Sequence, residues 1–413
     1  MSNSSVEVAV IGGGAAGIAA ARKLTAHGID CLIVEARARL GGRALTMHDV
    51  FGHALDMGCG WLHSADRNPW TGIATAQGRA FNKAPAPWER PMMTHIVPLD
   101  LQQDYGRAMA ALFARMARAM ESDHDVAASA FLEPGNKWNA TLNAVTTFIS
   151  GAELEHMSAI DFDRYSDSEL DWRLYDGYGA LIVSYGDNLP VALDCAVTRI
   201  DHRGKRLRIE TANGVIEADQ AVITLPTSIL GERDELFLPA LPDKTAIARR
   251  LPLGLDDKLF IGLLNAEEFG SDSRVLGRLD TSATASYQFR PFDRPMIEAY
   301  FGGACARELE AGGADAFFDF AVTELTGIFG NDFRQRLMPI GIHLWGADPY
   351  ARGAYSYAVP GAADERAALA APVDDRLFFA GEACSRSDFS TAHGAFITGN
   401  EAADRIIAIR RKS

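Results

Sequence analysis

The sequence has few cysteines and no paired metal-binding residues. Its five cysteines lie singly, without a CxxC pair, and its ten histidines form no HExxH motif. This scatter argues against a disulfide framework, a structural zinc site and catalysis by a bound metal. Such cysteine usage is typical of a reducing compartment, so we predict a cytoplasmic protein with no metal site.

Long apolar runs and an excess of positive charge are also missing. No stretch approaches the ~20 apolar residues of a membrane-spanning helix, and the N-terminus has no basic leader or cleavage site. The net charge of −14 disfavours nucleic acid and would attract cationic ligands, although charge alone identifies no ligand. The 413 residues, 48% of them hydrophobic, are enough for a large core and two domains.

A glycine-rich turn near the N-terminus is the most informative motif. An apolar strand at 6–11 runs into GGGAAG at 12–17 and then into an Ala-rich helix. Gly12 allows a tight turn, Gly14 lets the backbone approach a pyrophosphate, and Gly17 lets the helix pack on its strand. The phosphates would lie on N–H groups at the helix N-terminus. The predicted contacts of this dinucleotide site are Gly12, Gly14, Ala15, Ala16 and Gly17.

A second element indicates which dinucleotide binds. The apolar strand at 31–34 ends on Glu35, where a carboxylate should bind the adenosine ribose. The string RLGGR at 39–43 adds a glycine pair and places Arg43 so that it returns toward the pyrophosphate. An NAD site does not need this element, whereas the longer, extended FAD requires a further wall. The sequence therefore predicts FAD.

Three separated segments are predicted to form the cofactor-binding domain, namely 1–75, 189–249 and 371–413. In the second, a hairpin turn at Asn213-Gly214 is followed by an apolar strand at 221–225. The third combines a buried strand at 376–382 with a helix from His393 to Arg411.

Two insertions, 76–188 and 250–370, should together form an α+β substrate domain. The first contains five apolar residues at helical spacing, and the second contains a helix at 314–329. The predicted fold is therefore α/β, a Rossmann-like domain of the glutathione-reductase type with an inserted substrate domain. The five residues of the first helix are Met109, Leu112, Phe113, Met116 and Met120.

Four longer strings carry a resemblance to a known family. They are GCGWLH at 58–63, LPLGLDDKL at 251–259, WGADPYARGAYSYAVPG at 345–361 and LFFAGEACSRSDFSTAHGAFITG at 377–399. They resemble the flavin-containing amine oxidases, in that family's order, and are most similar to the polyamine and spermine oxidases.

Two positions differ from the monoamine oxidases of that family. Ala354 stands where they carry the cysteine that attaches the flavin, so the resemblance implies non-covalent FAD. Thr391 stands where they place the second tyrosine of an aromatic cage.

The resemblance also implies roles for individual side chains. Lys258 matches the lysine that holds a water beside the flavin. His63 would bind or deprotonate an ammonium substrate, unless it is a satisfied core histidine. Tyr355 and Trp345 would present aromatic faces to the amine. Further cofactor contacts implied by the resemblance are Gly58, Trp61, Val197, Gly381, Glu382, Thr391 and Ala392.

The predicted reaction is the oxidation of a small cationic amine. No second glycine turn for NAD(P)H and no redox cysteine pair are present, so the electrons must come from the substrate. A hydride would leave the α-carbon for the flavin, the imine would be hydrolysed to an aldehyde, and O2 would become hydrogen peroxide.

The substrate itself is left open by the sequence. A polyamine requires carboxylates for its distal ammonium groups, and a cyclic, aryl or alkyl monoamine would not. An amino acid would need Arg290 or Arg352 for its carboxylate. A desaturase-like dehydrogenase and a demethylase or FAD scaffold are further alternatives, although the long helical hairpin of the demethylases is missing. The available carboxylates are Glu89, Asp167, Glu169 and Asp171.

Overall fold

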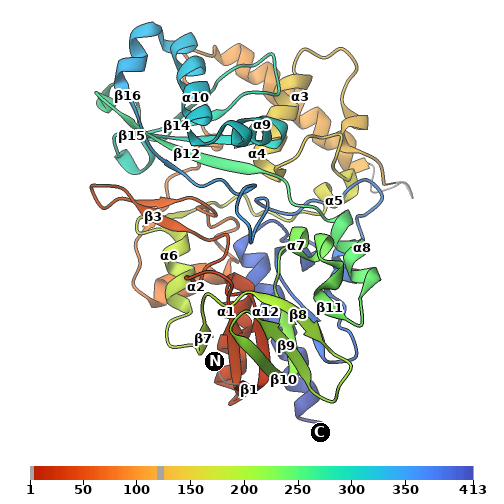
Figure 1. The fold of residues 1–413 in the computed structure, drawn as a ribbon. Coiled ribbons are helices and arrows are strands. Elements are labelled where there is room, and N and C mark those ends of the chain that lie inside the picture. Colours follow the sequence, from red (N-terminus) through yellow and green to blue (C-terminus); the bar gives the residue numbers. More distant parts are fainter. Residues whose placement is uncertain (1–3, 119–124, 413) are drawn as a thin grey trace.

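The strands of the protein form two large sheets at opposite ends of the molecule (Figure 1). The computed structural model describes residues 4–118 and 125–412. The eight-stranded sheet has mostly parallel pairings, and the five-stranded sheet is antiparallel. The predicted fold class, a Rossmann-like unit with an additional α+β unit, is confirmed.

The larger sheet has the strand order β11-β8-β9-β10-β1-β2-β7, with β17 paired to β10. Strand β1 lies between β10 and β2 and is parallel to both. Its apolar residues Val8–Ile11 are buried because helices cover both faces of a parallel sheet. The strands are β1 (Ser4–Ile11), β2 (Cys31–Val34), β7 (Val191–Ala192), β8 (Val197–Asp201), β9 (Leu207–Thr211), β10 (Gly214–Ile223), β11 (Phe237–Leu238) and β17 (Leu377–Phe379).

Strand β10 is longer than the sequence predicts. The hairpin strand after Gly214 and the apolar strand at 221–225 are one continuous element. Its first half pairs with β9 and its second half with β17. The polar residues between the halves do not interrupt it, because Asp219 forms ion pairs with arginines at the surface and the Gln220 amide donates to the Asp375 carbonyl.

Helices cover both faces of the larger sheet. Val8 and Val10 point toward α1 and α12, whereas Ala9 and Ile11 point to the opposite face, where α8 and α11 pack. The helices of this part are α1 (Ala15–Ala26), α2 (Pro69–Ala76), α6 (Tyr178–Tyr185), α7 (Thr227–Glu232), α8 (Pro242–Arg250), α11 (Glu365–Ala370) and α12 (Ala392–Arg410).

Helices α1 and α12 touch backbone to backbone. A Cβ at Gly399 of α12 would lie 2.2 Å from the Ala16 carbonyl oxygen of α1. Helix α6 packs in the same core through Tyr178 and Leu181, although the sequence assigns this segment to the substrate domain. Part of the first insertion therefore belongs to the core of the larger sheet.

The smaller sheet has the order β13-β14-β15-β12-β16. Helices α9 and α10 pack on one face, where Ala306, Phe317 and Leu325 join Phe301 of β15 in the core. Helix α10 has the predicted bounds. The elements are β12 (Asp256–Leu263), β13 (Ser273–Leu276), β14 (Ser286–Phe289), β15 (Met296–Gly302), β16 (Leu337–Ile342), α9 (Gly303–Gly312) and α10 (Ala314–Phe329).

The first insertion supplies helices beside the smaller sheet, and short strands from it and from residues 46–56 lie between the sheets. Leu112 and Met116 of the predicted apolar stripe are buried in α3, Phe113 is 37% exposed, and Met120 lies outside the described residues. In the described part of the chain, no helix has the length and apolar character needed to cross a bilayer. The elements are β3 (Thr46–His48), β4 (Ala54–Asp56), β5 (Phe81–Asn82), α3 (Leu99–Ala117), α4 (Asn139–Ser150), α5 (Ala159–Asp163) and β6 (Arg173–Leu174).

Candidate active site

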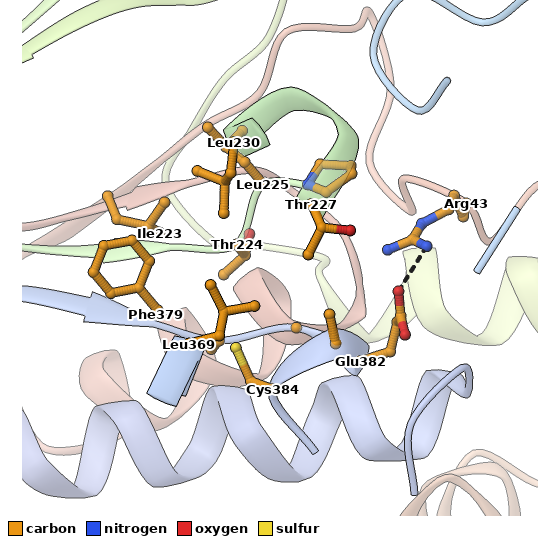
Figure 2. A pocket seen from close by; sticks show the side chains of 14 residues that line it. Arg43, Ile223, Thr224, Leu225, Thr227, Leu230, Leu369, Phe379, Glu382 and Cys384 are labelled. Carbon is orange, nitrogen blue, oxygen red and sulfur yellow. Dashed lines mark hydrogen bonds and ion pairs between the residues drawn. The ribbon is translucent and has the colours of Figure 1, made fainter. Parts of the chain in front are cut away.

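The parallel strands β1, β10 and β17 all have their carboxyl ends on the same side of the larger sheet. We call this side, where the strands end, the dinucleotide edge. Segments that follow β10 and β17 line a cavity of about 20 Å³ there, together with Arg43 (Figure 2). Ligands of open α/β sheets bind at this edge. The cavity has room for about one water, so the groups that converge on the edge, rather than its volume, mark it as a ligand site. Its polar lining includes Arg43, Thr224, Thr227 and Glu382.

The glycine turn after β1 leaves room for backbone alone at two positions. Gly12 has a φ of +103°, and a Cβ there would lie 2.5 Å from Thr224 Oγ1. A Cβ at Gly17 would lie 1.9 Å from the Gly12 carbonyl oxygen, so α1 packs directly on the turn. At Gly14 the nearest atom would be the Gly41 carbonyl oxygen at 3.9 Å. The backbone at Gly14 is therefore the part that a ligand can approach.

The first turn of α1 offers N–H groups to an anion. Ala15, Ala16 and Gly17 occupy its first three positions, where an N–H group has no acceptor within the helix. The helix dipole adds partial positive charge at this end. The pyrophosphate predicted from the sequence fits these groups.

Glu35 lies at the carboxyl end of β2 with both oxygens hydrogen-bonded. Its side chain is buried, and Oε2 accepts the Gly13 N–H at 2.6 Å while Oε1 accepts the Arg37 N–H at 2.8 Å. The Cys195 N–H donates to the Glu35 carbonyl, which brings the start of β8 alongside. Val197, two residues after Cys195, therefore begins β8 near Glu35, where the predicted cofactor contact would have it.

Arg43 and Glu382 form an ion pair across the edge (Figure 2). Arg43 Nη1 donates to Glu382 Oε1 at 2.9 Å and to the Ala354 carbonyl at 2.7 Å. Glu382 Oε2 accepts the Ser356 hydroxyl at 2.6 Å and the Ser390 N–H at 2.9 Å. Burial raises the pKa of Glu382, but Arg43 and the Ser356 hydrogen bond outweigh it and the net pKa is lowered. Glu382 is therefore an ionised carboxylate that binds Arg43, Ser356 and Ser390 at once.

The N-terminus of α12 reaches the same edge. The Thr391 hydroxyl caps the helix, accepting the Gly394 N–H at 2.9 Å and donating to the Asp388 carbonyl. The Ala392 carbonyl accepts the Trp70 indole N–H at 3.1 Å. His393 is buried and lies 3.4 Å from an Asp388 carboxylate oxygen. Gly381, with φ of +139°, has nothing within 4 Å of where a Cβ would stand.

A short glycine segment connects this edge with Lys258. A Cβ at Gly58 would lie 1.7 Å from the Arg43 carbonyl oxygen, and one at Gly60 would lie 3.2 Å from Lys258 Nζ. Lys258 is 5% exposed, and its ammonium lies 3.7 Å from Glu298 Oε1. The lysine therefore lies beside the dinucleotide edge, on the face of the smaller sheet that turns toward it.

A ladder of four side chains leads outward from Lys258. The backbones at Leu62 and Trp172 pair antiparallel, so Trp61, His63, Asp171 and Arg173 share one face of the ribbon. The Arg173 guanidinium lies over the Trp61 ring at 4.8 Å. One step outward, His63 Nδ1 lies 2.8 Å from Asp171 Oδ1.

The outer end of the ladder is acidic. Ligand atoms of His63, Asp167 and Asp171 all lie within 4.8 Å of one another. Burial lowers the pKa of His63, but the hydrogen bond to Asp171 and the two carboxylate charges outweigh it, so its pKa is raised. Trp88 packs edge-on against Trp61 at 4.5 Å and is 45% exposed. Of the four carboxylates predicted from the sequence, Asp167 and Asp171 join this cluster.

The two predicted aromatic walls differ in position. Tyr355 donates its hydroxyl to the Phe148 carbonyl at 2.8 Å, and burial, with Asp256 nearby, raises its pKa well above the ordinary value. Trp345 is 2% exposed, and its indole N–H donates to the Met57 carbonyl at 2.9 Å. A Cβ at Gly58 would lie 3.1 Å from the Trp345 ring, so Trp345 lies behind the glycine segment and Tyr355 lies nearer Asp256.

Sequence reasoning missed the buried charges around Lys258. Arg173 and Glu298 form an ion pair at 2.8 Å with both side chains at most 5% exposed. The arginines suggested for an amino acid lie elsewhere: Arg290 pairs with Asp293 and donates to Phe269, and Arg352 pairs with the exposed Glu232. Alternation along β12 and β15 signals which residues share a face, but the pairing of these strands is not visible in the sequence.

These two regions define a dinucleotide-binding protein with a second, partly acidic site beside a buried lysine. Residues 67–407 match the family model described as flavin containing amine oxidoreductase, and residues 10–74 match an NAD(P)-binding Rossmann-like domain. The chain belongs to the flavin-containing amine oxidoreductase family. That family implies a flavin cofactor, an amine substrate and O2.

Known relatives fall into several groups. The chain is similar to polyamine oxidase 2 of Arabidopsis thaliana, with 28% identity over 98% of this chain and 88% of that protein. It is 28% identical to lysine-specific histone demethylase 1 homolog 3 of Oryza sativa subsp. japonica over 95% of this chain, but spans only 53% of that protein. A solved double mutant of a putrescine oxidase shares the fold, with a TM-score of 0.78, 16% identity and coverage of 98% of this chain and 100% of that one.

Proposed function

We propose that this protein binds FAD without a covalent link and oxidises a small amine that carries a second positive charge, with O2 as electron acceptor. The observation that carries the proposal is the ladder from Trp61 and Arg173 to His63 and Asp171. Residues i and i+2 of a strand lie about 7 Å apart. A diamine with its reacting end beside Lys258 could place its other ammonium on the acidic end.

The residues present fit FAD. The first turn of α1 and Glu35 would hold the adenosine diphosphate half, and Arg43 with Gly58 would hold the part that runs toward Lys258. When bound, FAD supplies the acceptor for the hydride. Ala354 has no sulfur for a covalent link, and its backbone carbonyl accepts a hydrogen bond from Arg43.

Charge differs between the two ends of the ladder. The outer cluster combines one imidazole with two carboxylates, so it stays negative even when His63 is protonated. At the inner end, burial raises the pKa of Asp256 well above the ordinary value, although Lys258 and Tyr355 oppose this effect. An uncharged carboxyl beside an ammonium favours the neutral form of an amine there. The outer end thus binds an ammonium, and the inner end favours the amine that can release a hydride.

The protons and electrons of each step of the reaction can be accounted for. The hydride takes two electrons from the α C–H bond and leaves an iminium. Water, which Lys258 would hold, adds to the iminium and releases an aldehyde and the nitrogen fragment. O2 takes the two electrons with two protons and becomes hydrogen peroxide.

An amino-acid substrate is disfavoured by the same geometry. The arginine at the site, Arg173, is already neutralised by Glu298 at 2.8 Å. A substrate carboxylate would have to displace a fully buried partner.

A matched substrate pair tests the proposal. We expect the purified flavoprotein to release hydrogen peroxide with 1,4-diaminobutane, and kcat/KM to be at least about tenfold lower for butylamine, which lacks only the second amino group and the roughly 1.4 kcal/mol that tenfold represents. Asp171→Asn should remove most of this preference. Glu169→Gln, a neighbouring exposed carboxylate, is the control and should leave it. Equal kcat/KM for the two amines in the native protein would refute the proposal.

A further inference from the structure

Lys258 belongs to a buried triad of charges. Its Nζ lies 3.7 Å from Glu298 Oε1, and the other oxygen, Glu298 Oε2, lies 2.8 Å from Arg173 Nη1. Glu298 is fully buried, and both cations are about 5% exposed. One carboxylate therefore serves two cations with little access to water.

Strands β12 and β15 of the smaller sheet and strand β6 bring these three residues together. In the antiparallel pair of β12 and β15, Lys258 lies opposite Tyr300, and Glu298 lies opposite Phe260. Lys258 and Glu298 therefore share one face. Arg173 comes from β6, in the first insertion, and its guanidinium is held between the rings of Trp61 and Phe292. The pairing depends on three segments that are distant in the sequence.

Hydrogen bonds fix the carboxylate of Glu298. The Tyr300 hydroxyl donates to Glu298 Oε1 at 2.7 Å and accepts the Trp61 indole N–H at 3.4 Å. Burial raises the pKa of Tyr300 well above its ordinary value, so this hydroxyl stays a donor. Burial also raises the pKa of Glu298, but Arg173 and Lys258 outweigh burial and lower it overall. Glu298 is thus ionised, and its carboxylate is contacted by one hydroxyl donor and two cations.

Among the described residues, Glu298 is the carboxylate that lies within ion-pair distance of Lys258. Asp256, on the same strand, has a pKa raised well above its ordinary value by burial. Burial raises the pKa of the Cys59 thiol to about 12. The charged and titratable groups that face Lys258 are Asp56, Cys59, Arg173, Asp256, Glu298 and Tyr300.

We propose that Glu298 is a positioning residue that holds the Lys258 side chain as a fixed ammonium, and that Arg173 competes with Lys258 for the same carboxylate. The proposal rests on the proposed function, because it gives Lys258 its role beside the flavin. Removing Glu298 leaves two buried cations together, so Lys258 loses its proton at lower pH. Removing Arg173 leaves the carboxylate to Lys258 alone, so Lys258 keeps its proton to higher pH. The two substitutions therefore act in opposite directions.

The test measures how fast light-reduced flavin reacts with O2, which requires no amine. Stopped-flow rate constants are collected between pH 6 and 10 for the native holoenzyme, Lys258→Met, Glu298→Gln and Arg173→Gln. We expect a rate that falls as Lys258 loses its proton, and no such fall in Lys258→Met. The midpoint should move down by about one pH unit or more in Glu298→Gln, as removal of an adjacent opposite charge requires. It should move up in Arg173→Gln.

A matched control separates this role from a structural one. Glu324 is also a buried glutamate that accepts a tyrosine hydroxyl, from Tyr287 at 2.8 Å, but it lies on α10 and away from Lys258. Glu324→Gln should lower stability and leave the pH midpoint in place. A midpoint that is absent in the native protein, that persists in Lys258→Met, or that does not move in Glu298→Gln and Arg173→Gln would overturn the proposal.

A second measurement needs neither flavin nor turnover. Urea unfolding of the FAD-free protein is compared for Lys258→Met, Glu298→Gln and the double variant. A coupled pair requires that the double variant be more stable than the sum of the single effects predicts. Additive effects would overturn the proposal, whereas failure of every amine to be oxidised would refute only the proposed function.

Discussion

Arg366 is a buried charge that contacts the candidate active site through the Ser356 hydroxyl. Its side chain is fully buried, and it binds both oxygens of Asp161, through Nε at 2.7 Å and Nη2 at 2.8 Å. Nη1 donates to the Ser356 hydroxyl at 2.8 Å, and the guanidinium lies 3.9 Å from the centre of the Phe389 ring. Arg366→Met keeps the volume and removes all of these hydrogen bonds.

The expected loss follows from what the substitution leaves behind. The Asp161 carboxylate, 2% exposed, would keep the hydrogen bond from the Ala358 N–H at 3.2 Å but lose its cation. Removing one member of a buried ion pair costs about 3–5 kcal/mol. We therefore expect the free energy of unfolding of Arg366→Met to fall by about that amount, measured by urea unfolding followed by circular dichroism.

Two comparisons make this prediction specific. The double variant Asp161→Val with Arg366→Met should recover more than half of the loss, because an apolar pair of similar volume replaces the ion pair. Arg278→Met, which breaks an exposed pair with Asp280, should have no measurable effect. A loss below about 1 kcal/mol in Arg366→Met, the range of exposed pairs, would refute the reasoning.

Three further predictions concern the cofactor, the helix contact and pH. Because Ala354 has no sulfur, acid precipitation should release all of the yellow colour into the supernatant; colour that stays with the precipitate would contradict non-covalent binding. Gly399→Ala should lower the free energy of unfolding by about 1–3 kcal/mol, as overpacking does, since its Cβ would lie 2.2 Å from the Ala16 carbonyl oxygen; unchanged urea unfolding would show that the helices can separate freely. The pKa of His63 is raised by Asp171, so its stabilising contribution should be complete at acid pH and disappear as the pH rises through the folded-state pKa. The difference in unfolding free energy between the native protein and His63→Ala should therefore shrink from pH 5.5 to pH 9, and Asp171→Asn should abolish that trend; a difference that is constant with pH would contradict the pairing.

The parts of the site that depend on neighbouring residues could be predicted from the sequence. The glycine turn at Gly12 and Gly17 and the acidic end of β2 at Glu35 are set by backbone geometry within a few residues. The helix from 314 to 329 is likewise marked by its own apolar spacing. Local geometry of this kind depends on residues that are adjacent in the sequence, so the dinucleotide edge could be predicted from the sequence.

Contacts between segments that are distant in the sequence could not be predicted in this way. Glu298 and Arg173 lie 125 positions apart and meet because β15 and β6 both reach the same side of Lys258. Nothing near either residue in the sequence indicates a partner, since a buried ion pair has no periodicity. The single strand β10 was divided in two for a related reason: its polar middle is satisfied by partners that only the folded chain supplies.

Strand β10 carries a consequence for how the protein acquires its cofactor. The second half of β10 pairs with β17, and Glu382 and Thr391 follow β17 in the chain. Gly12 and Arg43 are synthesised first, but the groups opposite them come more than 300 residues later. Until nearly the whole chain has been translated, the glycine turn therefore lacks these groups and α1 is not covered by α12. A cofactor site that uses both sets of groups is therefore complete only at the end of synthesis.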